Sequence, residues 1–176
     1  MTQPPPPAAM RVLGVDTSLR SSGAAVIEKR AGQLATLEYT VIRNPARLQV
    51  SRCLDRLQRG IAELIERWRP DVAAVEGVFY CRNAKTALAL GQARGVVLAA
   101  CAAAGLPVFE YAPRRVKQAV VGYGAAEKDQ VRRMVMAILK LDEPPADDAS
   151  DALAIAVCHM YGAGRWTGGP LMAREI

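Results

Sequence analysis

The sequence has few of the residues on which thiolate, metal-thiolate and nucleophilic chemistry usually depends. Only four cysteines occur among 176 residues, no two of them form a Cys-x-x-Cys pair, and the single histidine is His159. Zinc sites need several Cys or His ligands at short spacings, so a zinc module is excluded. We expect the cysteines to be buried, reduced thiols, as is usual in the cytosol.

Long apolar runs are also lacking. The most apolar stretch, residues 96–109, has 14 residues, whereas a helix needs about 20 to span the hydrocarbon core of a membrane. The first residues do not combine a basic segment, an apolar run and a cleavage site, which together mark a secretory leader. These features predict a soluble, cytoplasmic protein without a membrane partner.

Length and composition predict one globular domain. A chain of 176 residues is long enough for a single well-buried core, and 51% hydrophobic with 23% charged residues argue against collagen, coiled coil and wholesale disorder. Residues 1–9 are proline-rich and residues 162–176 are glycine-rich, so we expect a disordered N-terminal tail and a flexible C-terminal tail. The folded domain is therefore expected over residues 10–161.

Positive charge is concentrated in the middle of the chain. The net charge is +6, and residues 77–140 carry ten basic but only three acidic side chains, whereas residues 141–176 carry two basic and six acidic ones. A basic segment of this kind favours a polyanionic partner such as nucleic acid. The acidic segment that follows predicts either a solvated helix start or a metal site.

Hydrophobic periodicity predicts an α/β domain. Strands are expected over residues 11–16, 23–29, 34–42, 72–76 and 107–111. Helices are expected over residues 54–69, 83–104, 131–139 and 147–160. This order predicts a five-stranded mixed sheet, with three antiparallel strands followed by two parallel strands, flanked by helices.

Gly91 and Gly95 lie on one side of the helix at 83–104, where small residues permit a second helix to approach.

Two carboxylates end two of the predicted strands. Asp16 closes the first strand and Glu76 closes the fourth. If these strands are parallel neighbours, both side chains emerge at the carboxyl edge of the sheet, where ligand sites of α/β proteins lie. A single acid at a strand end is more often a turn former or a helix cap, but the pair together points to a ligand site.

The last predicted helix adds a second pair of acids. Asp148 and Asp151 are three residues apart and therefore share a face, which continues as a core stripe through Ile155. Acids in a first helical turn also complement the helix dipole without any further function. Asp147 remains an alternative to Asp148, since it precedes Asp151 by four residues.

Four converging carboxylates would repel one another and raise some of their pKa values unless a cation lay among them. Oxygen-only ligands select a hard divalent ion, which predicts Mg²⁺, with Mn²⁺ as a possible substitute. Four acids suffice for two ions about 3.5 to 4 Å apart, an arrangement that hydrolyses phosphodiesters without a serine, cysteine or histidine nucleophile. The metal set predicted in this way is Asp16, Glu76, Asp148 and Asp151.

Four segments also carry a resemblance to a known family. They are GVDTSLRSSGAAVIE, VAAVEGVFYCRNAKTALALGQARGVVLAA, PVFEYAPRRVKQAVVGYGAAEKDQV and DDASDALAIAVCH. In this order and spacing the chain resembles the RuvC family of bacterial Holliday junction resolvases, over nearly all of residues 10–159. The resemblance implies a ribonuclease H-like fold, a homodimer, and an endodeoxyribonuclease of recombination and repair that nicks two like-polarity strands of a four-way junction symmetrically, with Mg²⁺.

The resemblance implies roles for individual residues and for partners. It makes Phe79 an aromatic that stacks near the junction centre, the helix at 83–104 the dimer contact, and RuvA and RuvB branch-migration partners. The catalytic residues would be Asp16, Glu76, Asp148, Asp151, Lys117 and Lys128. For such a nuclease the basic segment predicts a DNA path, held mostly through phosphates, which with Phe79 would comprise Arg82, Lys85, Arg114, Arg115, Lys117, Lys128, Arg132 and Arg133.

Two alternative functions are consistent with parts of the sequence. The segment GVDTSLRSSG also resembles the first phosphate loop of actin-like and sugar kinases, but those enzymes need two such lobes and leave the pair Asp148 and Asp151 unexplained. The second alternative is a non-catalytic, basic nucleic-acid-binding module. Its affinity for nucleic acid would fall with salt concentration just as that of the nuclease would. That module predicts no strand scission with any divalent ion.

Overall fold

The computed structural model describes residues 9–77, 83–162 and 174–176. Its strands are β1 (Met10–Asp16), β2 (Ser21–Arg30), β3 (Gln33–Arg43), β4 (Val72–Glu76), β5 (Val108–Tyr111) and β6 (Arg174–Glu175). Its helices are α1 (Val50–Trp68), α2 (Ala84–Ala103), α3 (Pro113–Val121), α4 (Lys128–Leu139) and α5 (Asp147–Gly162). Nearly all of the expected N-terminal tail and most of the expected C-terminal tail lie outside the described residues.

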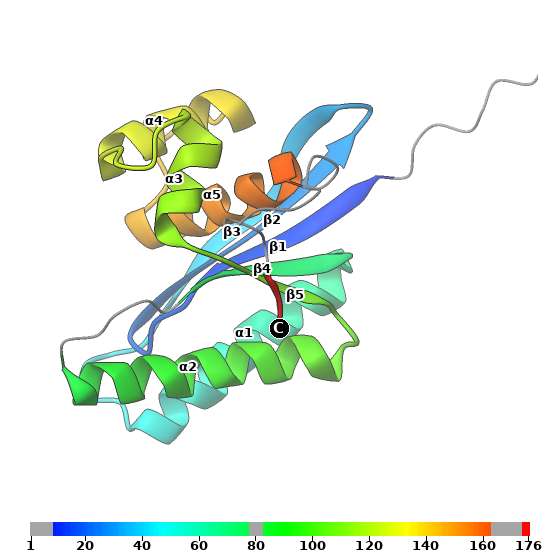
Figure 1. Cartoon of the computed structure of the whole chain (residues 1–176). Helices are drawn as coiled ribbons and strands as arrows, with labels where there is room; N and C mark the ends of the chain where they lie inside the picture. Colours follow the sequence, from blue (N-terminus) through cyan, green and yellow to red (C-terminus); the bar gives the residue numbers. More distant parts are fainter. Residues whose placement is uncertain (1–8, 78–82, 163–173) are drawn as a thin grey trace, which may run out of the picture.

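The strands form one mixed sheet in the order β3-β2-β1-β4-β5-β6 (Figure 1). β1, β2 and β3 are antiparallel neighbours, and β4 runs parallel to both β1 and β5. The five predicted strands and their directions are therefore confirmed. The two-residue β6, which pairs antiparallel with β5, is an additional edge strand within the segment assigned to the C-terminal tail.

Helices cover both faces of the sheet (Figure 1). α1 and α2 lie on one face, over a core that includes Leu13, Val15 and Val75. α5 lies on the other face, with α3 and α4 packed against it. β1 and β4 are therefore covered on both sides, which explains why each reads as a short, nearly continuous apolar run.

The boundaries of α1 and the helices after β5 differ in detail from the sequence expectation. α1 begins at Val50, four residues before the first residue of the predicted stripe, and ends at Trp68. Arg69, the predicted last residue, caps the helix in the left-handed conformation before Pro70. A proline restricts the residue before it, so the helix cannot continue. α3, with a proline at its first position, was not predicted as a separate helix.

Two glycines let α5 lie directly on the sheet. A Cβ atom at Gly14 would overlap the carbonyl oxygen of Ala152, and one at Gly23 would overlap the carbonyl oxygen of Asp148. Backbone therefore meets backbone at both places, on β1 and on β2. This close approach fixes the first turn of α5, and with it Asp148 and Asp151, against the end of β1.

One face of α2 has no cover within the described residues. Ala93, Val97 and Cys101 are buried beneath the helix, whereas Leu88 is 65% exposed. By length and composition alone, α2 could also cross a membrane, a property that the 14-residue apolar run in the sequence did not indicate. In the fold it lies along the sheet beside α1 (Figure 1).

Candidate functional site

The carboxylates at the ends of β1 and β4 lie side by side. Val15 pairs with Val75 in the parallel ladder, so Asp16 and Glu76, the next residue of each strand, reach the same edge of the sheet. The expectation that the two strands are parallel neighbours is thus confirmed. Parallel pairing directs both side chains to the same face because each follows its pleat in phase with the other.

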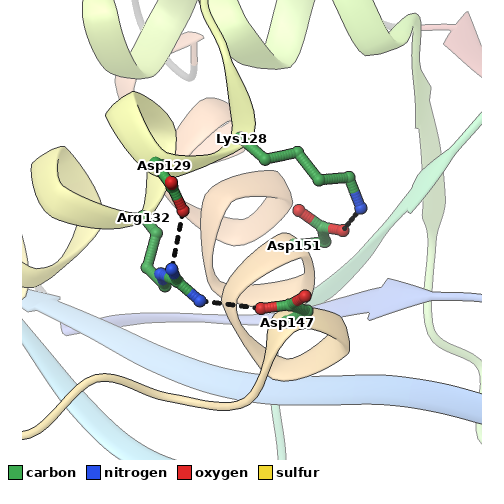
Figure 2. Close-up of polar contacts among 5 residues, drawn as sticks. All are labelled: Lys128, Asp129, Arg132, Asp147 and Asp151. Carbon is green, nitrogen blue, oxygen red and sulfur yellow. Dashed lines mark hydrogen bonds and ion pairs between the residues drawn. The ribbon is translucent and has the colours of Figure 1, made fainter.

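A cavity of about 370 Å³ connects this edge with α5. Asp16, Glu76 and Asp151 line it, together with two cations, Lys117 of α3 and Lys128 of α4. Lys128 Nζ lies 3.1 Å from Asp151 Oδ2 (Figure 2). Three of the four predicted metal ligands and both predicted active-site lysines therefore share one cavity.

Asp148 lies beside this cavity rather than in its lining. The hydroxyl of Ser21, the first residue of β2, donates a hydrogen bond to Asp148 Oδ2. The negative charge of Asp148 still contributes to raising the pKa of Asp16. Asp148 is thus an electrostatic neighbour of Asp16, held by a side chain from the sheet.

Asp147 points elsewhere. Its carboxylate lies 2.8 Å from Arg132 Nη1, and the same guanidinium lies 2.6 Å from Asp129 Oδ1 (Figure 2). This arrangement places Asp147 in an ion-pair cluster with α4. Of the two alternatives left open by the sequence, the geometry favours Asp148 over Asp147 as the partner of Asp16.

Burial and mutual repulsion make the carboxylates of the cavity harder to ionise. Burial is the main cause that raises the pKa of Asp16 from 3.8 to about 7, and the charges of Asp151, Glu76 and Asp148 add to it. Burial and Asp151 also raise the pKa of Glu76. Asp151, through its hydrogen bond and its charge, raises the pKa of Lys128. The carboxylates of the site therefore carry more negative charge than Lys117 and Lys128 can neutralise.

The raised pKa of Asp16 predicts how the metal-free protein responds to pH. Between pH 3.8 and about 7 the native state retains a proton that the unfolded chain has already released, so the free energy of unfolding falls as the pH rises. The amide introduced by Asp16→Asn cannot ionise, so the variant does not show this fall in the free energy of unfolding. We expect the variant to gain about 2 to 4 kcal/mol over wild type on going from pH 4 to pH 8, since each pKa unit corresponds to about 1.4 kcal/mol.

The measurement is urea unfolding of both proteins at a series of pH values with a chelator present. Asp55→Asn, at an exposed ion pair on α1, is the matched control and should follow wild type. Parallel pH profiles for wild type and Asp16→Asn would contradict the electrostatic account of the site.

The donor set suits a hard divalent cation. All four candidate ligands offer carboxylate oxygens, the donors that Mg²⁺ and Mn²⁺ prefer, and the excess negative charge favours a cation there. Across residues 9–77, 83–162 and 174–176, no three Asp, Glu, His or Cys side chains already form a closed metal-binding group. Ser21 binds Oδ2 of Asp148 and Lys128 binds Oδ2 of Asp151. Because a carboxylate has two oxygens, each acid could bind a cation through Oδ1 while it keeps this partner.

The remaining predicted DNA contacts differ in their surroundings. Arg114 and Arg133 are exposed on α3 and α4, the helices that border the cavity. Arg132 is bound to two acids, and Arg115 is half-buried. Lys85 lies apart from the cavity, in a separate hollow of about 830 Å³. Phe79 and Arg82 lie outside the described residues.

Sequence reasoning missed two residues that touch the site. Ser21 contacts Asp148 across 127 positions of the chain, and no periodicity could have revealed that pair. Arg94 of α2 donates a hydrogen bond from Nη1 to the backbone carbonyl of Glu76 at 2.7 Å. For Arg94 a signal did exist, because it is the single charged residue between Lys85 and the end of α2.

Comparisons with known proteins find relatives that match most of the chain. The family model described as crossover junction endodeoxyribonuclease RuvC matches residues 12–159. The protein of that name from Moorella thermoacetica is 54% identical over 151 residues, which cover 85% of this chain and 90% of the relative. The one from Geobacter sulfurreducens is 47% identical over 154 residues, which cover 88% of this chain and 94% of the relative.

Solved structures give the same result. Thermus thermophilus RuvC in complex with a Holliday junction substrate superposes with a TM-score of 0.83 at 36% identity, over 88% of this chain and 94% of that one. The yeast mitochondrial Holliday junction resolvase Ydc2 superposes with a TM-score of 0.64 at 14% identity, over 86% of this chain and 79% of that one. The second similarity concerns the fold alone.

Proposed function

This chain belongs to the RuvC family of crossover junction endodeoxyribonucleases, and from that premise we propose that the cavity between β1, β4 and α5 is its active site. Membership makes the chain an enzyme, a Holliday junction-resolving endonuclease of recombination and repair with a ribonuclease H-like fold. The two alternatives, a kinase-like phosphate loop and a non-catalytic binding module, are therefore not adopted. What remains to be assigned is which residues do the chemistry.

One observation carries the assignment of the site. Carboxylates from two strand ends and one helix come together beside two lysines, in a cavity where burial and repulsion raise the pKa of Asp16 to about 7. A fold gains no stability from such a cluster by itself, whereas a cation and a phosphate together would balance its charges. We assign the divalent ions, two Mg²⁺, to Asp16, Glu76, Asp148 and Asp151.

The chemistry that bound divalent ions supply is polarisation of the scissile phosphate and activation of an attacking water. The protein's own groups would do the rest. Lys117, half-buried in the cavity wall, would bind a non-bridging phosphate oxygen, and Lys128 would stabilise the charge that develops as the bond to the leaving oxygen breaks. Ser21 would orient the carboxylate of Asp148 by its hydroxyl hydrogen bond.

The DNA arms would run over the helices that border the cavity. Arg114 and Arg133 are exposed cations there, and they would contact phosphates without reading bases. Arg132 would be less available to phosphates, since Asp129 and Asp147 bind its guanidinium. We also infer a cytoplasmic location and, from the family alone, cooperation with the branch-migration proteins RuvA and RuvB.

Incubation with a synthetic four-way junction tests this proposal. With Mg²⁺ or Mn²⁺ we expect nicks in two strands of like polarity at symmetric positions, and with a chelator we expect binding without nicks. Nicking that persists in the chelator, or no nicking with either ion, would contradict the proposed metal centre.

We further propose that the uncovered face of α2 is the homodimer contact. Leu88, Gly91, Gly95 and Ala99 follow one another at three- or four-residue steps on its exposed side, so a second helix can approach closely. Leu88, 65% exposed, lies on this stripe of small residues, so the exposed side of α2 is a continuous apolar surface, the kind that marks interaction sites.

Leu88→Lys tests the dimer. A charge placed in an apolar contact loses its hydration without a partner, so we expect dimer affinity to fall at least about tenfold and the paired nicks to become uncoupled. Sedimentation equilibrium measures the affinity. Tyr123→Lys, which changes an equally exposed residue on the turn between α3 and α4, is the control and should remain dimeric. An unchanged dimer in Leu88→Lys would rule out this face.

A further inference from the structure

Arg94 connects α2 with the strand that carries Glu76. Its Nη1 donates a hydrogen bond to the Glu76 carbonyl oxygen at 2.7 Å, and its Nη2 lies 2.6 Å from Glu110 Oε2. The Arg94 side chain is only 14% exposed. Hydrogen bonds that involve a charged group are roughly twice as strong as neutral ones, so this buried fork holds the ends of two strands to one helix.

The carbonyl that Arg94 binds belongs to the last residue of β4. Glu76 pairs with Tyr111 in the ladder with β5, and Gly77 N–H donates to the Tyr111 carbonyl oxygen at 2.9 Å. After Gly77 the chain leaves the described sheet. The hydrogen bond from Arg94 is thus the contact from the α2 face that holds the backbone of Glu76 at the point where the strand ends.

Glu76 is therefore held from both sides of the sheet. Its side chain lines the cavity shared with Asp16 and Asp151, whereas its carbonyl oxygen is bound from the side of α2. Rotation or displacement of the peptide at Glu76 would move its carboxylate relative to Asp16, and a displacement of about 1 Å at a reacting centre can lower a rate about a hundredfold.

We propose that Arg94 is a positioning residue for Glu76: through the fork to the Glu76 carbonyl and Glu110, it sets where the Glu76 carboxylate stands in the active site. This inference rests on the proposed role of Glu76 as a metal-binding carboxylate. Arginine suits the task because its planar guanidinium binds two acceptors in a fixed geometry, whereas lysine presents a single flexible ammonium group.

The fold offers a matched control for Arg94. Arg11 makes the same kind of fork, from Nε to Glu28 Oε2 at 2.9 Å and from Nη1 to the backbone carbonyl of Trp68 at 2.8 Å. Arg11 lies near the start of β1, the strand end opposite to Asp16. Arg94→Met and Arg11→Met therefore remove contacts of the same kind, to one carboxylate and one backbone carbonyl, at the active-site edge and at the far edge respectively, although Arg11 is the more exposed, at 38%.

Single-turnover nicking of a junction at saturating protein tests the proposal. We expect Arg94→Met to nick about 10- to 100-fold more slowly, as is usual when a partner of a metal ligand is lost, with junction affinity in Ca²⁺ unchanged within about twofold. Arg94→Lys should recover only part of the rate. Arg11→Met should nick at the wild-type rate, even where urea unfolding shows an equal loss of stability.

Ion binding by the free protein gives a readout independent of activity. Titration with Mn²⁺, followed by calorimetry, should show weaker binding for Arg94→Met than for Arg11→Met. A wild-type nicking rate for Arg94→Met, or a loss that disappears when the junction is saturated, would overturn the proposal. Glu76→Gln separates the two hypotheses: if it nicks normally, the proposed metal centre itself is wrong, whereas an inactive Glu76→Gln beside a fully active Arg94→Met overturns the role of Arg94 alone.

Discussion

Asp16→Asn is expected to eliminate nicking of a four-way junction while leaving junction binding intact. Asp16 is the carboxylate on which the charges of Asp151, Glu76 and Asp148 all act, so the amide removes the donor at the centre of the proposed metal set. Ions in such sites contribute several kcal/mol to the transition state, and each 1.36 kcal/mol is tenfold in rate. We therefore expect a rate at least about a thousandfold lower.

Junction affinity should be unchanged or slightly higher in this variant, because the substitution removes a negative charge from a site that binds phosphate. Single-turnover nicking in Mg²⁺ and gel-shift titration in Ca²⁺ measure the two quantities separately. Asp147→Asn is the control, because Asp147 binds Arg132 away from the cavity, and it should retain cutting within a few-fold. Nicking by Asp16→Asn at more than about a tenth of the wild-type rate would contradict the assigned role.

The sheet was predictable because its signals are local. β1 and β4 are short runs of small and branched apolar residues, and each ends in a carboxylate, so strand type and the position of Asp16 and Glu76 followed from a few adjacent residues. The strand directions followed from the connections, since a helix between two strands favours parallel pairing. The pairing of β5 with β6 was not predictable, because β6 has only two residues and carries no periodicity.

The candidate site was predictable only in part. Helical spacing placed Asp148 and Asp151 on one face and favoured Asp148 over Asp147, because the face of Asp148 continues as a core stripe. It could not reveal the partners that hold the two acids, Ser21 for Asp148 and Arg132 for Asp147. These partners come from β2 and α4, distant in sequence. Lys117 and Lys128 followed from the family resemblance alone, since an isolated lysine has no pattern that distinguishes a cavity wall from a solvated surface.

Close packing at Gly23 was beyond sequence reasoning as well, and it has a large expected effect. Gly23 pairs with Asp16 in the ladder between β1 and β2, and α5 lies so close that a Cβ atom there would overlap the backbone of Asp148. Because the obstacle is backbone within a buried helix, neither partner can rotate away. Gly23→Ala must therefore push the first turn of α5 off the sheet.

We expect Gly23→Ala to lower the free energy of unfolding by about 1 to 3 kcal/mol or more, as overpacking of a core does. The nicking rate should fall by about a hundredfold in protein that is still folded, since a displacement of about 1 Å suffices for that loss. Urea unfolding and single-turnover nicking below the unfolding transition measure both effects.

Gly60→Ala separates steric overlap from the general effect of replacing glycine. A Cβ atom at Gly60 on α1 would lie 2.6 Å from Ile42 Cδ1, the end of a flexible side chain that can move, and alanine favours a helix over glycine by about 0.5 to 1 kcal/mol. We therefore expect Gly60→Ala to retain both stability and nicking. If Gly23→Ala behaves as Gly60→Ala does, then α5 does not rest on β2 at this point, and the sheet does not fix Asp148 beside Asp16.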